Sequence, residues 1–258
     1  MSTRLPGNEV QLDEEKRMLA IESATDDPAS AHRRIRLYNT LNCTVLDEQA
    51  LPAGASEDQD YFIADITFNK LSHLVGIRGK YRVFVYDMLA AKLLPELEPR
   101  YPESVMEESR QAGTVEKLEV WEDYLLGFEA VRGAFAFDLS TPSEPRPMLP
   151  LASFQSPEEG WRSLFLLPSG PEYQAMVPFY DPATQRLDLN LVFSEPQPIF
   201  LNQSRPSPDG RFVVLRVSDV AQARAVVVDL EGGKRIALPD VYARGNDDQL
   251  FEYLRSRR

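Results

Sequence analysis

The chain has 258 residues, enough to bury a sizeable core as one large β domain or as two small ones. Its 40 acidic and 28 basic residues give a formal net charge of −12. This charge argues against a nucleic-acid partner and against an anionic membrane, because both bind basic surfaces. It is compatible with a basic protein partner, and equally with an acidic surface that only keeps the protein in solution.

The amino-terminal residues 1–8 lack the apolar core of a signal peptide, and no run approaches the ~18 apolar residues of a membrane span. We therefore expect a cytoplasmic protein that does not bind membranes. Cys43 is the single cysteine, so an intrachain disulfide and a metal site built on several cysteines are both excluded. Its strand-like surroundings predict a buried structural thiol.

The first unit of the chain has two interpretations. Asn8–Asp13 and Arg17–Glu22 read as strands, but Leu12–Glu22 also has the propensity and periodicity of an amphipathic helix. We favour strands, because two further strands that follow in this unit would otherwise have no partners.

An apolar segment that ends in Asp or Asn recurs five times. The spacings between these ends are 48, 51, 43 and 48 residues, and the ends are Asn39, Asp87, Asp138, Asp181 and Asp229. Self-similarity with a period of about 40–50 residues is typical of β-propellers, in which each blade is a four-stranded sheet. We assign each segment as the third strand of a blade.

The remaining strands of each blade are predicted from their position around these segments. Fourth strands are expected at Cys43–Asp47, Lys92–Leu97, Pro147–Leu149, Arg186–Val192 and Arg235–Leu238. Second strands are expected at His73–Arg78, Tyr124–Glu129, Ser163–Leu167 and Arg211–Val217. Innermost strands are expected at Tyr61–Phe68, Thr114–Trp121, Leu149–Phe154 and Ile199–Gln203.

The predicted fold class is therefore all-β: a single β-propeller domain over residues 1–258, with five blades of about four strands and a short C-terminal helix. The first blade depends on the strand interpretation given above. The alternative is a four-bladed or incomplete propeller with a helical N-terminal arm.

Residues 98–113 form an acidic insertion between the second and third blades. Pro102 followed by Glu103 predicts a short helix with acids in its first turn, and Gly113 predicts its end. From Glu96 to Glu129 there are ten acids and three bases, a net charge of −7. The insertion therefore lies in a region that carries −7 of the net charge of −12.

Residues 204–238 give the clearest repeat. The turn signature Pro208-Asp209-Gly210 precedes the apolar strand Arg211–Val217, and Val226–Val228 is followed by the hairpin glycines Gly232-Gly233. This arrangement resembles the TolB-like (WD-like) β-propeller repeat over about one blade. TolB-like proteins are often exported, and the expected cytoplasmic location departs from that resemblance.

The C-terminal residues 246–258 predict a helix capped by Asn246, with basic residues at its end. Two roles are open for this segment. The helix covers one face of the propeller, or the tail binds a partner.

We find no catalytic constellation in the sequence. His32 and His73 are the only histidines and belong to different units, and neither a nucleophile elbow nor a phosphate-binding loop is present. We expect no metal and no cofactor. The first hypothesis is a non-catalytic protein-binding module: a scaffold, or an inhibitor of a basic protein such as an immunity protein. Its predicted partner-binding residues are Tyr101, Glu103, Glu107, Glu108, Trp121, Trp161 and Arg162. For the tryptophans, packing of one blade on its neighbour is the competing interpretation.

The second hypothesis is a carbohydrate-active propeller, either a glycoside hydrolase or a sugar-binding protein. Some five-bladed propellers are glycosidases that use carboxylates on their inner strands. Asp65 and Glu119 lie on predicted inner strands and are the candidate catalytic pair. The competing interpretation is that both are solvated carboxylates at the rim.

Overall fold

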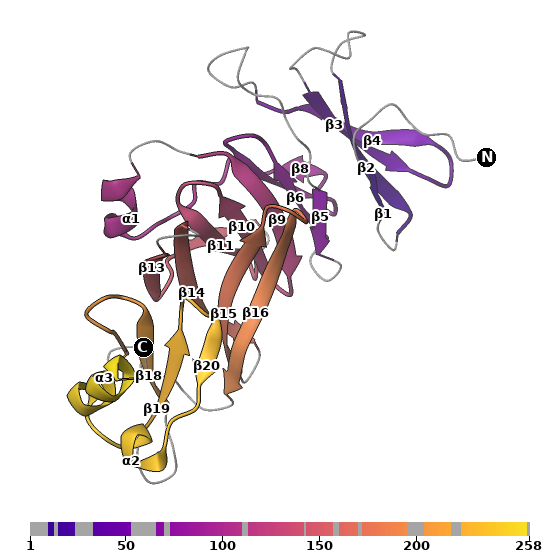
Figure 1. Ribbon diagram of the computed structural model, residues 1–258. Coiled ribbons are helices and arrows are strands. Elements are labelled where there is room, and N and C mark those ends of the chain that lie inside the picture. Colours follow the sequence, from indigo (N-terminus) through magenta and orange to yellow (C-terminus); the bar gives the residue numbers. More distant parts are fainter. Residues whose placement is uncertain are drawn as a thin grey trace. The chain divides into compact units, whose positions relative to one another are not determined.

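The computed structural model describes residues 10–12, 15–23, 33–52, 66–69, 73–109, 113–141, 143–156, 160–169, 172–195, 204–217 and 223–256. Within these residues the strands form five four-stranded antiparallel sheets, and inside each sheet neighbouring strands are consecutive in the chain (Figure 1). The chain divides into two compact units. The first comprises Met1–Arg100, Gln111–Ala130 and Phe135–Met148, and the second comprises Tyr101–Arg110, Val131–Ala134 and Leu149–Arg258.

The five sheets are named here in chain order. The first sheet contains β1 (Val10–Leu12), β2 (Arg17–Ser23), β3 (Arg33–Asn39) and β4 (Thr44–Ala50). The second contains β5 (Ile66–Asn69), β6 (Leu74–Arg78), β7 (Val83–Asp87) and β8 (Lys92–Leu93). The third contains β9 (Val115–Trp121), β10 (Tyr124–Glu129), β11 (Gly133–Asp138) and β12 (Arg146–Met148).

The fourth sheet contains β13 (Ala152–Ser156), β14 (Gly160–Ser169), β15 (Glu172–Asp181) and β16 (Arg186–Glu195). The fifth contains β17 (Arg205–Pro206), β18 (Phe212–Val217), β19 (Arg224–Asp229) and β20 (Lys234–Ile236). The described helices are α1 (Glu103–Glu108), α2 (Asp240–Ala243) and α3 (Asp247–Arg255).

The prediction of a mainly β protein is confirmed, and so is the strand interpretation of the first unit; the helix alternative for that unit is wrong. The second strand of the third sheet, Tyr124–Glu129, has the predicted bounds. The predicted inner strand Ile199–Gln203 and residues 61–65 of another lie outside the described residues. The single domain, the number of blades and the TolB-like repeat stay predictions.

The recurrent Asp or Asn has a structural explanation in the first four sheets. Its side-chain oxygen accepts a hydrogen bond from the amide two residues further on, at 2.8–2.9 Å. Such an Asx turn starts the reversal from the third strand to the fourth. The fifth of these recurrent residues, Asp229, is only 4% exposed. Its carboxylate instead accepts hydrogen bonds from Arg211 Nε and Nη2 at 3.0 and 3.1 Å.

The prediction of a buried thiol at Cys43 is wrong. Cys43 is exposed and has a φ of +57° in the turn before β4, where the Asn42 side chain caps the amide of Thr44. The strand therefore begins one residue later than predicted. Two helix details also differ from expectation: α1 ends at Glu108 rather than at Gly113, and α2 was not predicted.

In the first unit, the first and second sheets pack face to face. Their core contains Leu19, Ile21, Ile35 and Leu37 from one sheet and Val75, Ile77, Phe84 and Tyr86 from the other. The Tyr86 hydroxyl donates to Asp47 Oδ2 at 2.7 Å and so links the two sheets. In the third sheet, a Cβ at Gly127 would lie 2.1 Å from the Phe135 ring, so this close packing requires glycine.

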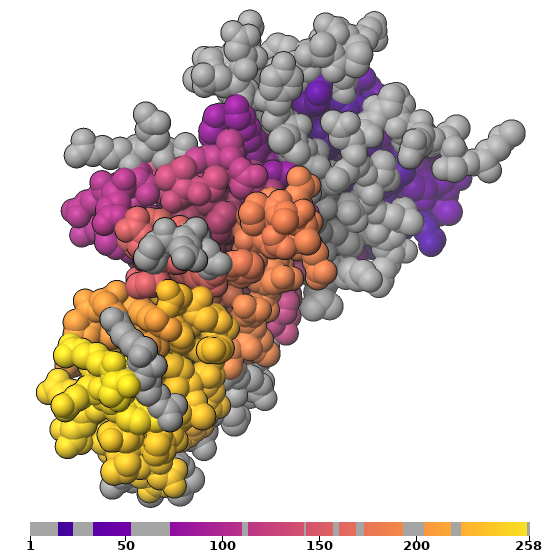
Figure 2. Space-filling view, in the orientation of Figure 1, coloured from indigo at the N-terminus to yellow at the C-terminus, as the bar shows by residue number. Residues whose placement is uncertain are grey.

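In the second unit, the fourth and fifth sheets share an apolar core that includes Val177, Val213 and Val228. The opposite face of the fifth sheet packs against Leu250 and Leu254 of α3. Figure 2 shows the yellow atoms of the C-terminal residues beside the orange atoms of the residues that precede them. The helix begins as predicted, because Asn246 Oδ1 accepts a hydrogen bond from the amide of Gln249 at 2.9 Å.

Candidate functional site

Helix α1 is held in place by a few contacts within the second unit. Val105 is fully buried, and the Arg132 guanidinium lies 5.7 Å from the centre of the Tyr101 ring. Arg132 Nε and Nη2 also donate to the carbonyl of Ser109 at 3.4 and 3.3 Å. These contacts fix both ends of the helix to the segment that precedes β11.

The other face of α1 presents carboxylates to solvent. Glu103, Glu107 and Glu108 are exposed, and none of them forms an ion pair with a described residue; we call them the acidic helix surface. Glu103 lies in the first turn, where the helix dipole favours an anion. Glu107 and Glu108 lie in the last turn, where the dipole disfavours one, and no basic residue occupies that turn. Their charges therefore do not help the helix to fold.

Trp121 is the one predicted binding residue that belongs to the first unit. It ends β9, is partly exposed, and stacks on Tyr124 across the hairpin with ring centres 6.1 Å apart. Burial raises the pKa of Tyr124 to about 12. The structure gives Trp121 a packing partner and a partly accessible edge.

Trp161 and Arg162 are buried in the second unit, with only 8% and 7% of their surfaces exposed. A Cβ at Gly133 would lie 2.6 Å from the carbonyl oxygen of Trp161, so the chain there passes too closely for any other residue. Arg162 stacks over Phe179 at 4.5 Å, and burial lowers the pKa of its guanidinium. Both side chains pack inside the unit and do not join the acidic helix surface, which agrees with the packing interpretation of Trp161.

The predicted carboxylate pair is only partly visible. Glu119 lies on β9 with 40% of its side chain exposed, and its carboxylate is 3.9 Å from Lys117 Nζ. Asp65 lies outside the described residues, so the distance between the two carboxylates is not given by the structure. Among the described residues, no group of three or more His, Cys, Asp or Glu side chains is placed to hold a metal ion. No helix in the described part of the chain is long and apolar enough to cross a membrane.

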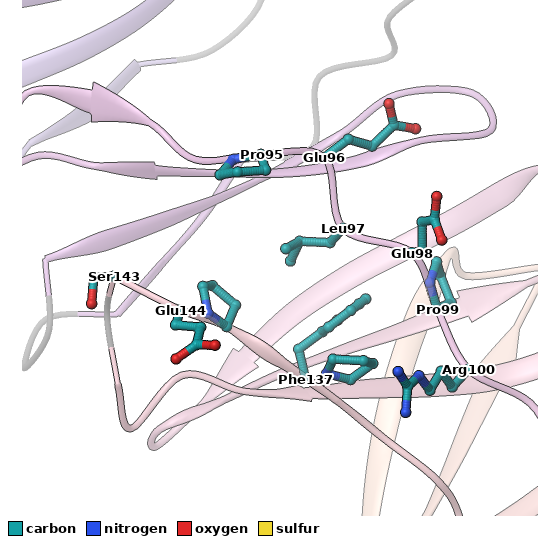
Figure 3. Close-up of a pocket in the computed structure, with 11 residues that line it drawn as sticks. Pro95, Glu96, Leu97, Glu98, Pro99, Arg100, Phe137, Ser143 and Glu144 are labelled. Atoms are coloured by element: carbon teal, nitrogen blue, oxygen red, sulfur yellow. The ribbon is translucent and has the colours of Figure 1, made fainter.

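Sequence reasoning missed a pocket of about 420 Å³ in the first unit (Figure 3). One wall is Pro95–Arg100, which follows β8, and the other comprises Phe137, Ser143, Glu144, Pro145 and Pro147 around β12. We call it the proline pocket, because four of these residues are prolines. The sequence does show two segments in which prolines recur at short spacing, Pro95 with Pro99 and Pro145 with Pro147. Only the fold brings these two segments together.

Backbone hydrogen bonds position both walls of the proline pocket. The amide of Leu97 donates to the carbonyl of Val83 at 2.9 Å, which ties the first wall to β7. On the other side Pro147 pairs with Phe137 in the antiparallel register of β11 and β12. The pocket is thus built on strand edges of the second and third sheets.

No protein-family model matches the chain, and neither does any curated protein. Solved structures give weak matches. A chain of the structure described as "Crystal Structure of Mitotic Checkpoint Complex" is 11% identical with a TM-score of 0.38, over 88% of this chain and 61% of that one. Hsv2 of Kluyveromyces lactis is 11% identical with a TM-score of 0.31, over 90% and 63%. A functionally unknown protein from Desulfotomaculum acetoxidans DSM 771 is 10% identical with a TM-score of 0.36, over 88% and 69%.

This chain therefore spans about three fifths of the length of the first two of these proteins. At TM-scores below 0.5, these matches support no conclusion about the number of blades, the closure of a ring or the function of this chain.

Proposed function

We propose that the protein is a non-catalytic binding module for a basic protein, acting as a scaffold or as an inhibitor of the immunity type. The observation that carries this proposal is the acidic helix surface. Glu107 and Glu108 are exposed, lack an ion pair with any described residue, and occupy the end of a helix that their charge disfavours. Carboxylates that oppose folding in this way are suited to a cationic partner, whose charge removes the unfavourable interaction on binding.

We further propose that the five sheets are the blades of a β-propeller with a TolB-like repeat. Two features support this arrangement. Each sheet is a four-stranded meander, and the Asp or Asn at the end of the third strand returns every 43–51 residues. The first and second sheets, and the fourth and fifth sheets, also pack through apolar faces, as blades do.

The test is a charge reversal that separates binding from folding. In the variant Glu107→Lys/Glu108→Lys, two cations replace anions at the helix C-terminus, so α1 gains stability or keeps it. We expect this variant to lose about tenfold or more in affinity for a labelled hexalysine peptide at low salt, measured by fluorescence anisotropy.

The matched control, Asp188→Lys/Glu252→Lys, makes the same charge change on β16 and α3, where both residues are exposed. We expect the control to lose no more than about twofold, the general effect of net charge. Equal losses in the two variants would contradict a binding role for α1. Binding of basic products of neighbouring genes, followed by size-exclusion chromatography with the same variants, extends the test to natural partners.

A further inference from the structure

The walls of the proline pocket are rigid and cannot pair with an added strand. Proline fixes φ near −65° and has no amide hydrogen, so Pro95, Pro99, Pro145 and Pro147 leave each wall short of donors. A pocket of this kind is formed before binding, which lowers the entropy lost by an occupant. Recognition there must rest on side chains rather than on a β-strand ladder.

The floor of the pocket is apolar and its rim is charged. Phe137 lies beneath the pocket and has no exposed surface, so the apolar surface open to an occupant comes from Leu97, which is 8% exposed, and from the four prolines. Figure 3 shows the carboxylates of Glu98 and Glu144 on opposite sides of Phe137. With Glu96 and Arg100, the lining holds three carboxylates and one guanidinium, a formal charge of −2.

The rim carboxylates differ in how firmly they are held. Glu96 accepts a hydrogen bond from Arg82 Nε at 2.8 Å, so its charge is already paired. Glu144 lies 3.5 Å from Arg146, but both side chains are more than 60% exposed, so this ion pair is weak. Glu98 is exposed and has no ion pair with a described residue. Glu98 and Glu144 are therefore available to an external cation.

We propose that the proline pocket binds a lysine or arginine side chain of the basic partner, with the aliphatic stem against Leu97 and the prolines and the cationic end at the rim, where Glu98 and Glu144 lie. Long cationic side chains combine an apolar stem with a charged head, which matches this floor and rim. The negative lining disfavours an anion, and the missing amides disfavour an extended backbone. This inference rests on the proposed function, since it names how one side chain of the same basic partner is recognised.

Two peptides of equal charge test the inference. Hexalysine is compared with a hexamer of 2,4-diaminobutyric acid, whose side chains are two CH₂ groups shorter, and both are titrated into the full chain by fluorescence anisotropy. Because each buried CH₂ strengthens binding by roughly fourfold, we expect hexalysine to bind about tenfold more tightly once one stem is seated.

Three variants then locate the site. Glu98→Gln/Glu144→Gln is expected to weaken hexalysine binding about fivefold or more and to remove most of the preference for the longer side chain. Arg100→Gln, which removes the competing cation, is expected to strengthen binding about two- to fivefold. Glu107→Gln/Glu108→Gln on α1 has the same charge change as the first variant and is expected to weaken both peptides equally, leaving the preference intact.

The outcomes separate the two proposals. If both peptides bind equally well to the unmodified chain, or if the preference survives Glu98→Gln/Glu144→Gln, the pocket proposal is wrong and the acidic helix surface is unaffected. If the preference depends on the pocket but the α1 variant changes neither affinity, the pocket stands and the role of α1 is wrong. Circular dichroism of each variant establishes that an observed loss is not unfolding.

Discussion

The first and fifth sheets each have two faces to shield from solvent or to make polar, and they differ in how the second face is treated. Each packs one apolar face on the next sheet of its own unit: the first through residues such as Ile35 and Leu37, the fifth through residues such as Val213 and Val228. Their other faces differ. The first sheet carries a network of ion pairs there, whereas the fifth carries an apolar surface covered by α3. Among the described residues, the second face of the first sheet is thus occupied by charged side chains and that of the fifth sheet by a helix.

On the first sheet, the network crosses three strands. Arg36 Nε donates to Glu48 on β4 at 2.6 Å, and Arg36 Nη1 donates to Glu22 on β2 at 3.0 Å. The Tyr38 hydroxyl donates to the other oxygen of Glu22 at 2.7 Å. The hydrogen bond to Glu48 raises the pKa of the Arg36 guanidinium. Glu22 and Arg36 therefore link the three strands of this face through charged hydrogen bonds.

On the fifth sheet, the helix is fixed by contacts at its start as well as by its apolar face. Arg216 on β18 donates to the carbonyl of Gly245 at 2.9 Å and forms an ion pair with Asp247. The rings of Tyr242 and Tyr253 stack with centres 4.2 Å apart, which joins α2 to α3. Polar and aromatic contacts therefore hold α3 in one position on the fifth sheet, in addition to its apolar face.

The largest expected effect is at the helix cover. Leu250→Ala removes a fully buried side chain between α3 and the fifth sheet, and we expect it to lower the free energy of unfolding by about 2–5 kcal/mol. Urea denaturation followed by circular dichroism measures this change. Gln249→Ala, one residue away on the exposed side, serves as the control and should shift stability by less than about 0.5 kcal/mol. A small effect of Leu250→Ala would mean that α3 does not protect the sheet.

An intermediate effect is expected at the charged face of the first sheet. Glu22→Gln removes the carboxylate that serves Arg36 and Tyr38, and we expect a loss of about 1–3 kcal/mol, because Glu22 is only 10% exposed.

The double variant Glu22→Met/Arg36→Met sharpens the comparison. Replacing a pair of charges by apolar side chains of similar size is often neutral or stabilising, and Glu48 keeps Arg34 at 3.5 Å. Because the Tyr38 hydroxyl loses its acceptor, we expect this variant to recover only part of the loss. Failure to recover in the same urea titration would show that the hydrogen bonds themselves hold this face.

The smallest effect is a dependence on pH. Burial, and next the hydrogen bond to Glu22, raise the pKa of Tyr38 above its ordinary value of about 10. The unfolded chain then loses its proton first, so the stabilisation is complete below pH ~10 and is lost as the pH rises through the folded pKa.

We expect the slope of stability against pH above pH ~10 to be shallower in Tyr38→Phe than in the unmodified chain. Thermal melts across this range measure the slope. An unchanged slope would place the alkaline transition elsewhere, for example at Tyr124, whose pKa is raised to about 12.

Much of this fold was predictable because its signals are local. Val83–Asp87 is an apolar run that ends in a turn residue, and Asn246 is a helix cap, and both features act over a few residues. The acidic helix at Glu103–Glu108 followed from proline and charge alone. Such elements depend little on the rest of the chain.

What the sequence could not predict depends on register and on tertiary neighbours. Cys43 is exposed because the turn before β4 takes one more residue than expected. The pairing of Glu22 with Arg36 requires the alignment of β2 with β3, and the proline pocket requires two segments more than forty residues apart to meet. Asp65, half of the alternative catalytic pair, lies outside the described residues.

The Asx turns have a consequence for how such a chain can change over time. In four of the five sheets, the turn between the third and fourth strands is closed by an Asp or Asn side chain that bonds within the same turn. The residues that reverse the chain there thus lie within the repeat itself. A duplicated copy of such a segment would turn back at the same residue wherever it was inserted. Gene duplication would then lengthen the array one sheet at a time and leave the connections between sheets free to differ in length and charge, as residues 98–113 differ from the other connections.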